Sequence, residues 1–149
     1  MYVNRKKVCK LLLYVWQLPQ NLLALAVMAY SRIVFGKAET TEYKGIVYKY
    51  YPKWRCGVSL GCYVLLGHVF DESPETIAHE WGHTRQSLIF GPLYLLFIGL
   101  PSGLGNLYDR FYHDKAHGWT HVQSYRWYYS QPWEKWADRL GGVERRFEE

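Results

Sequence analysis

The sequence predicts an α+β fold in which a small mixed sheet is flanked by helices. Two runs rich in β-branched and aromatic residues, 46–51 and 58–66, are typical of strands. Two later segments, 74–89 and 132–140, have helix start signals, helical periodicity and terminal glycines. With 149 residues, 49% of them hydrophobic and 18% aromatic, the chain can bury one core. We therefore expect one domain, at 37–149.

Residues 1–36 are predicted to form a separate N-terminal segment with one or two apolar helices. Four cations lie within its first ten residues, and the mostly apolar run 11–30 follows. A membrane-spanning helix needs about 20 mostly apolar residues, but residues 17–21 bring three polar side chains and a proline into the run. The segment fits a spanning helix, a signal peptide, helices at the membrane interface, or two buried helices of a soluble domain. We expect association with a membrane surface, with a cytoplasmic location as the alternative.

The helix predicted at 74–89 has well-marked ends. Ser73 is a suitable N-cap, Pro74 fits the first helical position, and Glu75 lies in the first turn. A Gly-Pro pair at 91–92 ends the helical pattern.

The periodicity gives this helix three different sides. At about 100° per residue, one side is a mostly apolar stripe made of Ile77, Trp81, Thr84 and Leu88. His79, His83 and Gln86 fall on roughly the opposite side. Ala78 and Gly82 form a narrow third side, where another element can approach closely. We therefore expect the helix to be packed on several sides, with its histidines facing an internal cleft.

The two histidines belong to the string H-E-x-x-H at residues 79–83. Residues four apart lie on the same face of a helix, so His79 and His83 can bind one Zn²⁺ ion together. Glu80 then lies beside the metal as a proton acceptor. A catalytic zinc takes three protein ligands and keeps one position for water, so a third ligand is needed.

The second predicted helix supplies that ligand. It starts after Ser130 or Gln131, has Pro132 at its first position, and stops at a glycine pair. Glu134 and Asp138 are four apart and share one face. One carboxylate can bind the metal, and the other can accept the free N–H of a ligating histidine and fix its tautomer.

The two motifs together, H-E-W-G-H followed by E-K-W-A-D, resemble the gluzincin type of zinc metallopeptidase in its small, minigluzincin form. The resemblance covers about residues 58–142 and implies zinc-dependent hydrolysis of peptide bonds in a peptide or protein substrate. It implies one Zn²⁺ ion with His79, His83 and Glu134 as its ligands. It also implies that Glu80 is the general base and that Asp138 is the hydrogen-bond partner of a ligating histidine.

The resemblance also implies an edge strand along the cleft, to which a peptide can add through main-chain hydrogen bonds. Residues 67–70 are the candidate for this strand. Trp133 differs from the asparagine that several gluzincins have before the glutamate ligand, and the chain is shorter than most secreted members. Elements of substrate specificity therefore do not transfer from the family.

The expected reaction needs a further hydrogen-bond donor. Zn²⁺ lowers the pKa of a bound water toward about 7, and Glu80 takes a proton from that water and delivers it to the leaving amine. The oxyanion of the tetrahedral intermediate needs its own donor. The segment between the two helices offers several candidates, and the sequence does not choose among them: Tyr112, His113, His117, His121, Tyr125, Tyr128 and Tyr129.

Two stretches of this connecting segment are predicted to be irregular. Residues 101–106 are rich in glycine and serine, which indicates a loop and a candidate flap near the cleft. Gly118, Trp119 and Thr120 are weak helix formers, so residues 113–121 are predicted to form a loop or short turns. We therefore expect no second metal at the histidines of that stretch.

Two other functions fit the same motif. A zinc amidase or a deformylase-like enzyme acts on a non-peptide amide, and in the deformylase pattern Cys62 would replace Glu134 as the third ligand. A non-catalytic binding or scaffold protein would use the zinc as a structural staple, usually with four protein ligands.

Charge and cysteine content bear on partners and compartment. The net charge is +5, but no basic–aromatic repeat accompanies it, so we expect no nucleic-acid partner. Cys9, Cys56 and Cys62 lack metal-site spacing, and their odd number argues against a disulfide framework. A reducing compartment fits best, and the oligomeric state stays open.

Overall fold

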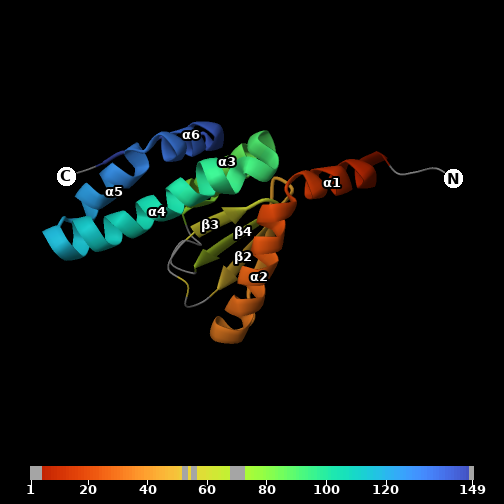
Figure 1. Ribbon diagram of the computed structural model, residues 1–149, viewed down its shortest axis with the longest axis horizontal. Coiled ribbons are helices and arrows are strands. Elements are labelled where there is room, and N and C mark those ends of the chain that lie inside the picture. Colours follow the sequence, from red (N-terminus) through yellow and green to blue (C-terminus); the bar gives the residue numbers. More distant parts are fainter. Residues whose placement is uncertain (1–4, 52–53, 55–56, 68–72, 148–149) are drawn as a thin grey trace.

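The computed structural model describes residues 5–51, 54, 57–67 and 73–147. It has the predicted α+β fold, with helices around a small mixed sheet (Figure 1). The elements follow in the order α1 Arg5–Trp16, α2 Leu18–Phe35, β1 Glu39–Tyr43, β2 Ile46–Tyr51, β3 Gly57–Leu60, β4 Tyr63–Gly67, α3 Pro74–Phe90, η2 Gly91–Leu93, η3 Leu95–Gly99, α4 Leu100–Tyr108, η4 Asp109–Ala116, α5 His121–Ser130 and α6 Pro132–Gly141.

The described sheet has four strands in the order β1-β2-β4-β3. β2 and β4 are parallel, and each pairs with an antiparallel edge strand. β2 has the predicted bounds, but the prediction of one strand at 58–66 is wrong. Gly61, with φ of 63°, turns the chain there and divides the run into the antiparallel strands β3 and β4. Glycine adopts this left-handed backbone without steric cost.

The hydrophobic core lies between the sheet and α3. Tyr48, Tyr50, Val64 and Leu66 are buried in one cluster, and Ile77 of α3 packs against it. α2 contacts the opposite face, where the Tyr51 hydroxyl donates to the carbonyl of Met28, because neighbouring residues of a strand point to opposite faces.

Helices α3 and α6 pack against each other through very small residues. A Cβ atom on Gly82 would overlap the backbone of Ala137, and a Cβ atom on Gly141 would overlap the backbone of Ala78. The prediction that Ala78 and Gly82 form a side of close approach is therefore confirmed. This contact brings two helices that are far apart in the sequence to the same site.

Both of these helices have the predicted ends. The Ser73 hydroxyl caps α3 by accepting from the Thr76 amide at 3.3 Å, and α3 ends at Phe90 before Gly91. Helix α6 starts with Pro132 and ends before Gly142, which has φ of 74°.

Between α3 and α6 the chain is almost entirely helical. Helix α4 contains residues 101–106, so the predicted loop and flap there are wrong. The predicted loop at 113–121 is confirmed only at residues 118–120, because helical residues occupy 113–117 and α5 begins at His121. Leucines at 100, 104 and 107 have helical spacing that outweighs the glycines, and Pro101 lies in the first turn, where a helix tolerates it.

The N-terminal segment forms the two helices α1 and α2, and α1 extends away from the sheet in Figure 1. Among the described helices, α2 alone is long and apolar enough to span a membrane, a test that core helices and signal sequences also pass. The polar residues that interrupt the run, Gln17, Gln20 and Asn21, are buried.

Candidate metal centre

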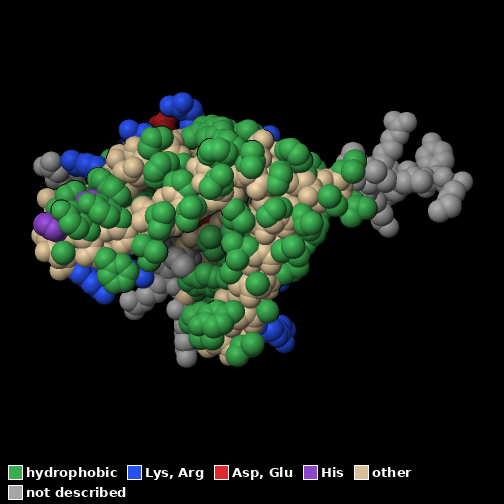
Figure 2. Space-filling view, viewed as in Figure 1, with side chains coloured by type: hydrophobic (Ala, Val, Ile, Leu, Met, Phe, Trp, Pro, Cys, Tyr) green, Lys and Arg blue, Asp and Glu red, His purple; other side chains and the backbone are tan. Residues whose placement is uncertain are grey.

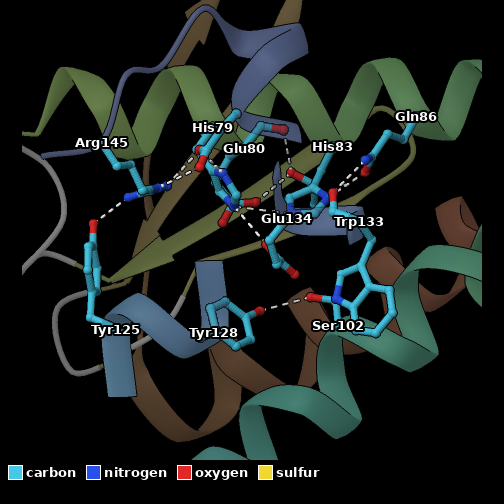
Figure 3. Close-up of polar contacts among 12 residues, drawn as sticks. His79, Glu80, His83, Gln86, Ser102, Tyr125, Tyr128, Trp133, Glu134 and Arg145 are labelled. Atoms are coloured by element: carbon cyan, nitrogen blue, oxygen red, sulfur yellow. Dashed lines mark hydrogen bonds and ion pairs between the residues drawn. The ribbon is translucent and has the colours of Figure 1, made fainter. Parts of the chain in front are cut away.

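The structure brings together the three side chains predicted as metal ligands. His79 and His83 of α3 and Glu134 of α6 are all buried, and their ligand atoms converge (Figure 3). The two Nε2 atoms are 3.1 Å apart, and each lies 3.1 Å from Glu134 Oε2. This buried group can hold a metal ion.

His79 is oriented by a carboxylate from α6. Its Nδ1 lies 2.7 Å from Asp138 Oδ1. Arg145 holds the same carboxylate with two hydrogen bonds, of 2.7 Å from Nε to Oδ2 and 2.9 Å from Nη2 to Oδ1. Although burial by itself raises the pKa of Asp138, the hydrogen bonds from His79 and Arg145 lower it below its ordinary value. An ionised carboxylate can only accept, so His79 donates through Nδ1.

His83 is oriented by an amide from its own helix. Its Nδ1 lies 2.7 Å from Gln86 Oε1, and Gln86 Nε2 donates to the carbonyl of Trp133 at 2.8 Å. Because the donation to Trp133 fixes the orientation of the amide, Oε1 faces the imidazole. His83 therefore also donates through Nδ1, and its Nε2 has a free lone pair in the neutral form.

Three acceptors consequently meet at one point. In neutral His79 and His83 both Nε2 lone pairs face each other and the carboxylate of Glu134, an arrangement that requires a cation or additional protons. Burial by itself lowers the pKa of His79, but hydrogen bonds to Asp138 and Glu134 outweigh it and raise this pKa to about 9. The site therefore attracts positive charge.

Spacing and an orphaned atom agree with a tetrahedral ion. Ligand atoms about 2.0–2.2 Å from a tetrahedral Zn²⁺ lie about 3.3–3.6 Å from one another, slightly more than the 3.1 Å separations found here. The other oxygen of Glu134, Oε1, is buried without a hydrogen-bond partner in the described part of the chain. Such an atom is costly in a protein interior unless a bound group satisfies it.

Glu80 lies beside this cluster and is held by the sheet. Its carboxylate Oε2 accepts from the Ser59 hydroxyl of β3 at 2.7 Å. A Cβ atom on Gly57 would collide with the other oxygen, Oε1. The absence of a side chain at Gly57 therefore makes room for the carboxylate, while Ser59 fixes its direction.

The cluster opens into a cavity of about 760 Å³. His79, Glu80 and His83 line it, together with residues from α2, β3, α4 and α5. All four residues of β3 take part, so the edge strand of the described sheet at the cavity is β3. The predicted edge strand at 67–70 has Gly67 in the inner strand β4, and its other residues lie outside the described part.

The candidate oxyanion donors are divided by the structure. Tyr128 and Tyr129 line the cavity, and the ring of Tyr129 meets that of His79 edge to face at 5.1 Å. The other five do not line the cavity. The rings of Tyr112 and His117 are in tilted contact, and His113 is buried against Trp119. His121 is exposed and stacks on Tyr125, which accepts a hydrogen bond from Arg145.

Cys62, the ligand of the deformylase-like alternative, is not part of the cluster. Its amide donates to Asn21 Oδ1 at 2.8 Å, and its sulfur lies 3.8 Å from Gln17 Nε2. Among the described residues, the third member of the group that could hold a metal ion is Glu134.

Three contributors to the site have roles that sequence reasoning missed: Ser59, Gln86 and Arg145. Gln86 shares the face of the two histidines, and that periodicity could have indicated its contact with His83. Ser59 and Arg145 act across the fold from β3 and from the segment after α6, and neither has a local sequence signal.

Comparisons of the chain with protein-family models, curated proteins and solved structures find no match.

Proposed function

We propose that this protein is a zinc-dependent hydrolase of peptide bonds, with Glu80 as the general base. One observation carries the proposal: the cluster of His79, His83 and Glu134 opens into the cavity that Glu80 also lines. A structural zinc site is usually closed by four protein ligands, whereas a catalytic site uses three and keeps one position open. The described cluster offers three ligands beside a carboxylate that is held in place but is not one of them.

The donor set favours zinc over other divalent ions. Two imidazole nitrogens and one carboxylate oxygen form a known catalytic zinc set, whereas Mg²⁺ and Ca²⁺ prefer oxygen ligands alone. The hydrogen bonds from His79 to Asp138 and from His83 to Gln86 add the outer support that such sites use.

Residues that surround the cluster have separate roles in the expected reaction. Zn²⁺ bound at this site would activate a water and polarise the scissile carbonyl. Glu80 accepts a proton on its carboxylate and passes it to the leaving nitrogen. Ser59 occupies Oε2 of Glu80 as a donor, so Oε1 is the oxygen that carries the proton.

Tyr128 is the proposed donor to the oxyanion. Its hydroxyl lies 2.9 Å from the Ser102 hydroxyl beside the cavity (Figure 3). Burial, with the negative charge of Glu134 adding to it, raises the pKa of Tyr128 far above its ordinary value, so the hydroxyl stays protonated. Tyr129 is less suited, because its ring is packed between His79 and the guanidinium of Arg145.

The position of β3 supports a peptide as the substrate. This edge strand lines the cavity along its whole length, so an extended chain can pair with it. The carbonyl of Ser59 already accepts from Tyr94 at 3.0 Å. The proposed pairing therefore uses the other main-chain groups of β3.

The test uses zinc-loaded protein and a mixed peptide library, with products identified by mass spectrometry. Glu80→Gln is expected to lower kcat/KM by about 10²–10⁴-fold while the zinc content stays at one ion per chain. Glu75→Gln, an exposed glutamate in the first turn of the same helix, is the matched control and should keep the full rate.

Two results would overturn the proposal. If Glu80→Gln hydrolyses peptides as fast as the parent protein, Glu80 is not the base. If the parent protein binds one zinc ion and cleaves no peptide in the library, the metal is structural.

A further inference from the structure

Helix α2 has its polar side buried and its apolar side exposed. Gln20 Nε2 donates to the Ser87 hydroxyl at 3.0 Å and to the carbonyl of Gly91 at 2.8 Å, and Asn21 accepts from the Cys62 amide. The exposed side of the helix carries leucines, and Ile33 is 85% exposed. A surface helix of a water-soluble protein has the opposite arrangement.

A second apolar surface lies on the helical run after α3. Leu96, Leu100 and Leu104 are each more than half exposed. The chain has no Asp, Glu, Lys or Arg between Arg85 and Asp109, and none between Lys10 and Arg32. The exposed sides of α2 before Arg32 and of the run from η3 through α4 therefore consist of apolar and uncharged groups. We call them together the apolar face.

The two parts of the apolar face meet at the mouth of the metal-site cavity. Leu23 of α2 and Leu100, Leu104 and Leu107 of α4 line that cavity, and all four are exposed at 43–55%. Figure 2 shows hydrophobic side chains over α2 and α4, with a hollow between them. The cavity that contains Glu80 thus opens through an apolar rim.

Cations stand at the sequence ends of both uncharged segments. Lys10 and Arg32 flank the first, and Arg85 and Arg110 flank the second; all four are exposed. Asp109, which precedes Arg110 in the sequence, is engaged with His113 at 2.8 Å. Exposed cations that flank apolar segments match a bilayer with anionic headgroups, where apolar side chains enter the acyl region and basic ones stay at its edge.

We propose that the apolar face docks into a lipid bilayer and that the metal-site cavity opens toward it. The buried side chains of Gln20 and Asn21 keep polar groups of α2 inside the protein, which leaves an apolar surface for the lipid. Since the mouth is rimmed by leucines of this face, the substrate enters from the membrane. The substrate of the proposed hydrolysis, on which this last step rests, is then a polypeptide held at the bilayer surface.

Flotation with vesicles of phosphatidylcholine and phosphatidylglycerol tests the docking without any reaction. The metal-free full-length protein is expected to float with the vesicles. The triple variant Leu22→Ser, Leu25→Ser, Leu96→Ser changes exposed residues that do not line the cavity. It is expected to bind roughly a hundredfold more weakly with an unchanged unfolding temperature, because apolar area buried in lipid drives the binding.

The control variant is Tyr43→Ser, which removes an exposed aromatic side chain from β1, outside the apolar face. It should float like the parent protein. The proposal is overturned if the parent protein stays in solution with these vesicles, or if the triple variant floats equally well. A parent protein that stays in solution as a dimer would show that the apolar face binds a second copy of the chain and not a membrane.

Rates of peptide hydrolysis distinguish a failure of the membrane-docking proposal from a failure of the proposed function. One peptide substrate is compared free in solution and with an acyl chain that anchors it to the vesicles. The parent protein should cleave the anchored form at least tenfold faster, and the triple variant should lose this preference but keep the rate on the free peptide. Equal rates for both forms would contradict entry from the membrane. Flotation without hydrolysis of either form would contradict the proposed function and leave the docking intact.

Discussion

The two imidazoles of the candidate metal centre are supported in different ways. His79 donates to the carboxylate of Asp138, which Arg145 also holds, so its support is ionic. His83 donates to the neutral amide of Gln86, which is fixed by a backbone carbonyl. One imidazole is thus held by a charged pair and the other by a dipole.

This difference indicates which changes the site should tolerate least. Both supports cross the interface of α3 and α6: Asp138 reaches from α6 to His79, and Gln86 reaches from α3 to the carbonyl of Trp133. Both imidazoles therefore depend on the contact between α3 and α6, whereas only the support of His79 involves charged groups. Changes to the interface should damage both sides, and changes to one support should damage them unequally.

The largest effect is expected from Gly82→Ala, which should break both supports at once. Its Cβ atom would overlap the backbone carbonyl of Ala137, so α3 and α6 must move apart. We expect a loss of about 1–3 kcal/mol in the free energy of unfolding and a loss of zinc affinity greater than that from either single support. Chemical denaturation and zinc titration measure the two effects.

Gly103→Ala is the matched control, because a Cβ atom there meets open space within α4. It should leave stability unchanged or raise it slightly, since alanine favours a helix more than glycine does. Equal stability of the two variants would contradict the close approach of α3 and α6.

The pH dependence of stability should report on the ionic support of His79 and not on the support of His83. In the metal-free protein, hydrogen bonds to Asp138 and Glu134 overcome the effect of burial and raise the pKa of His79 to about 9, from its ordinary 6.5. A raised histidine pKa stabilises the fold fully below pH 6.5, and this stability is lost as the pH rises to 9. We expect roughly 3 kcal/mol less unfolding free energy at the upper end of this range.

Urea unfolding with a chelator present, at several pH values, measures this loss. Asp138→Asn should flatten the dependence, because the imidazolium then has a neutral partner. A parent protein whose stability rises between pH 6.5 and pH 9 would contradict the ionic support of His79.

Asp138→Asn is also expected to weaken zinc binding by about 10- to 100-fold at neutral pH. The variant loses the negative charge that makes His79 a stronger ligand, and Arg145 loses its buried partner. Competition with a chromogenic chelator measures the affinity. Glu144→Gln, at an exposed position after α6, should bind zinc like the parent protein.

The parts of the fold that the sequence predicts well are those with local signals. Ser73 and Pro132 mark the starts of α3 and α6, and the bounds of β2 follow from its β-branched and aromatic residues. The helices between 91 and 130 escaped prediction, because glycine and proline indicate a loop when taken alone. In α4 the helical spacing of the leucines at 100, 104 and 107 outweighs the glycines, and Pro101 lies in the first turn, where a helix tolerates it.

The site divides in the same way. His79, His83, Glu134 and Asp138 meet as their helical spacing predicts. Arg145 and Ser59 could not be foreseen, because their contacts depend on how α6 and β3 fold back onto α3. The likeness to gluzincin peptidases and the hydrolytic activity stay predictions, and the Glu80→Gln variant tests the activity directly.

The smallest effect should come from Gln86→Leu, which removes the neutral support. Leucine fills a similar volume but leaves Nδ1 of His83 without an acceptor, so either tautomer becomes accessible. We expect about a tenfold loss of zinc affinity, at the low end of the range for such outer contacts. The loss should be smaller than that from Asp138→Asn, because no charge is removed. The stability difference between pH 6.5 and pH 9 should persist in this variant, since the charged partners of His79 are retained. If Gln86→Leu instead binds zinc more weakly than Asp138→Asn, the neutral contact governs the centre and the ionic one is secondary.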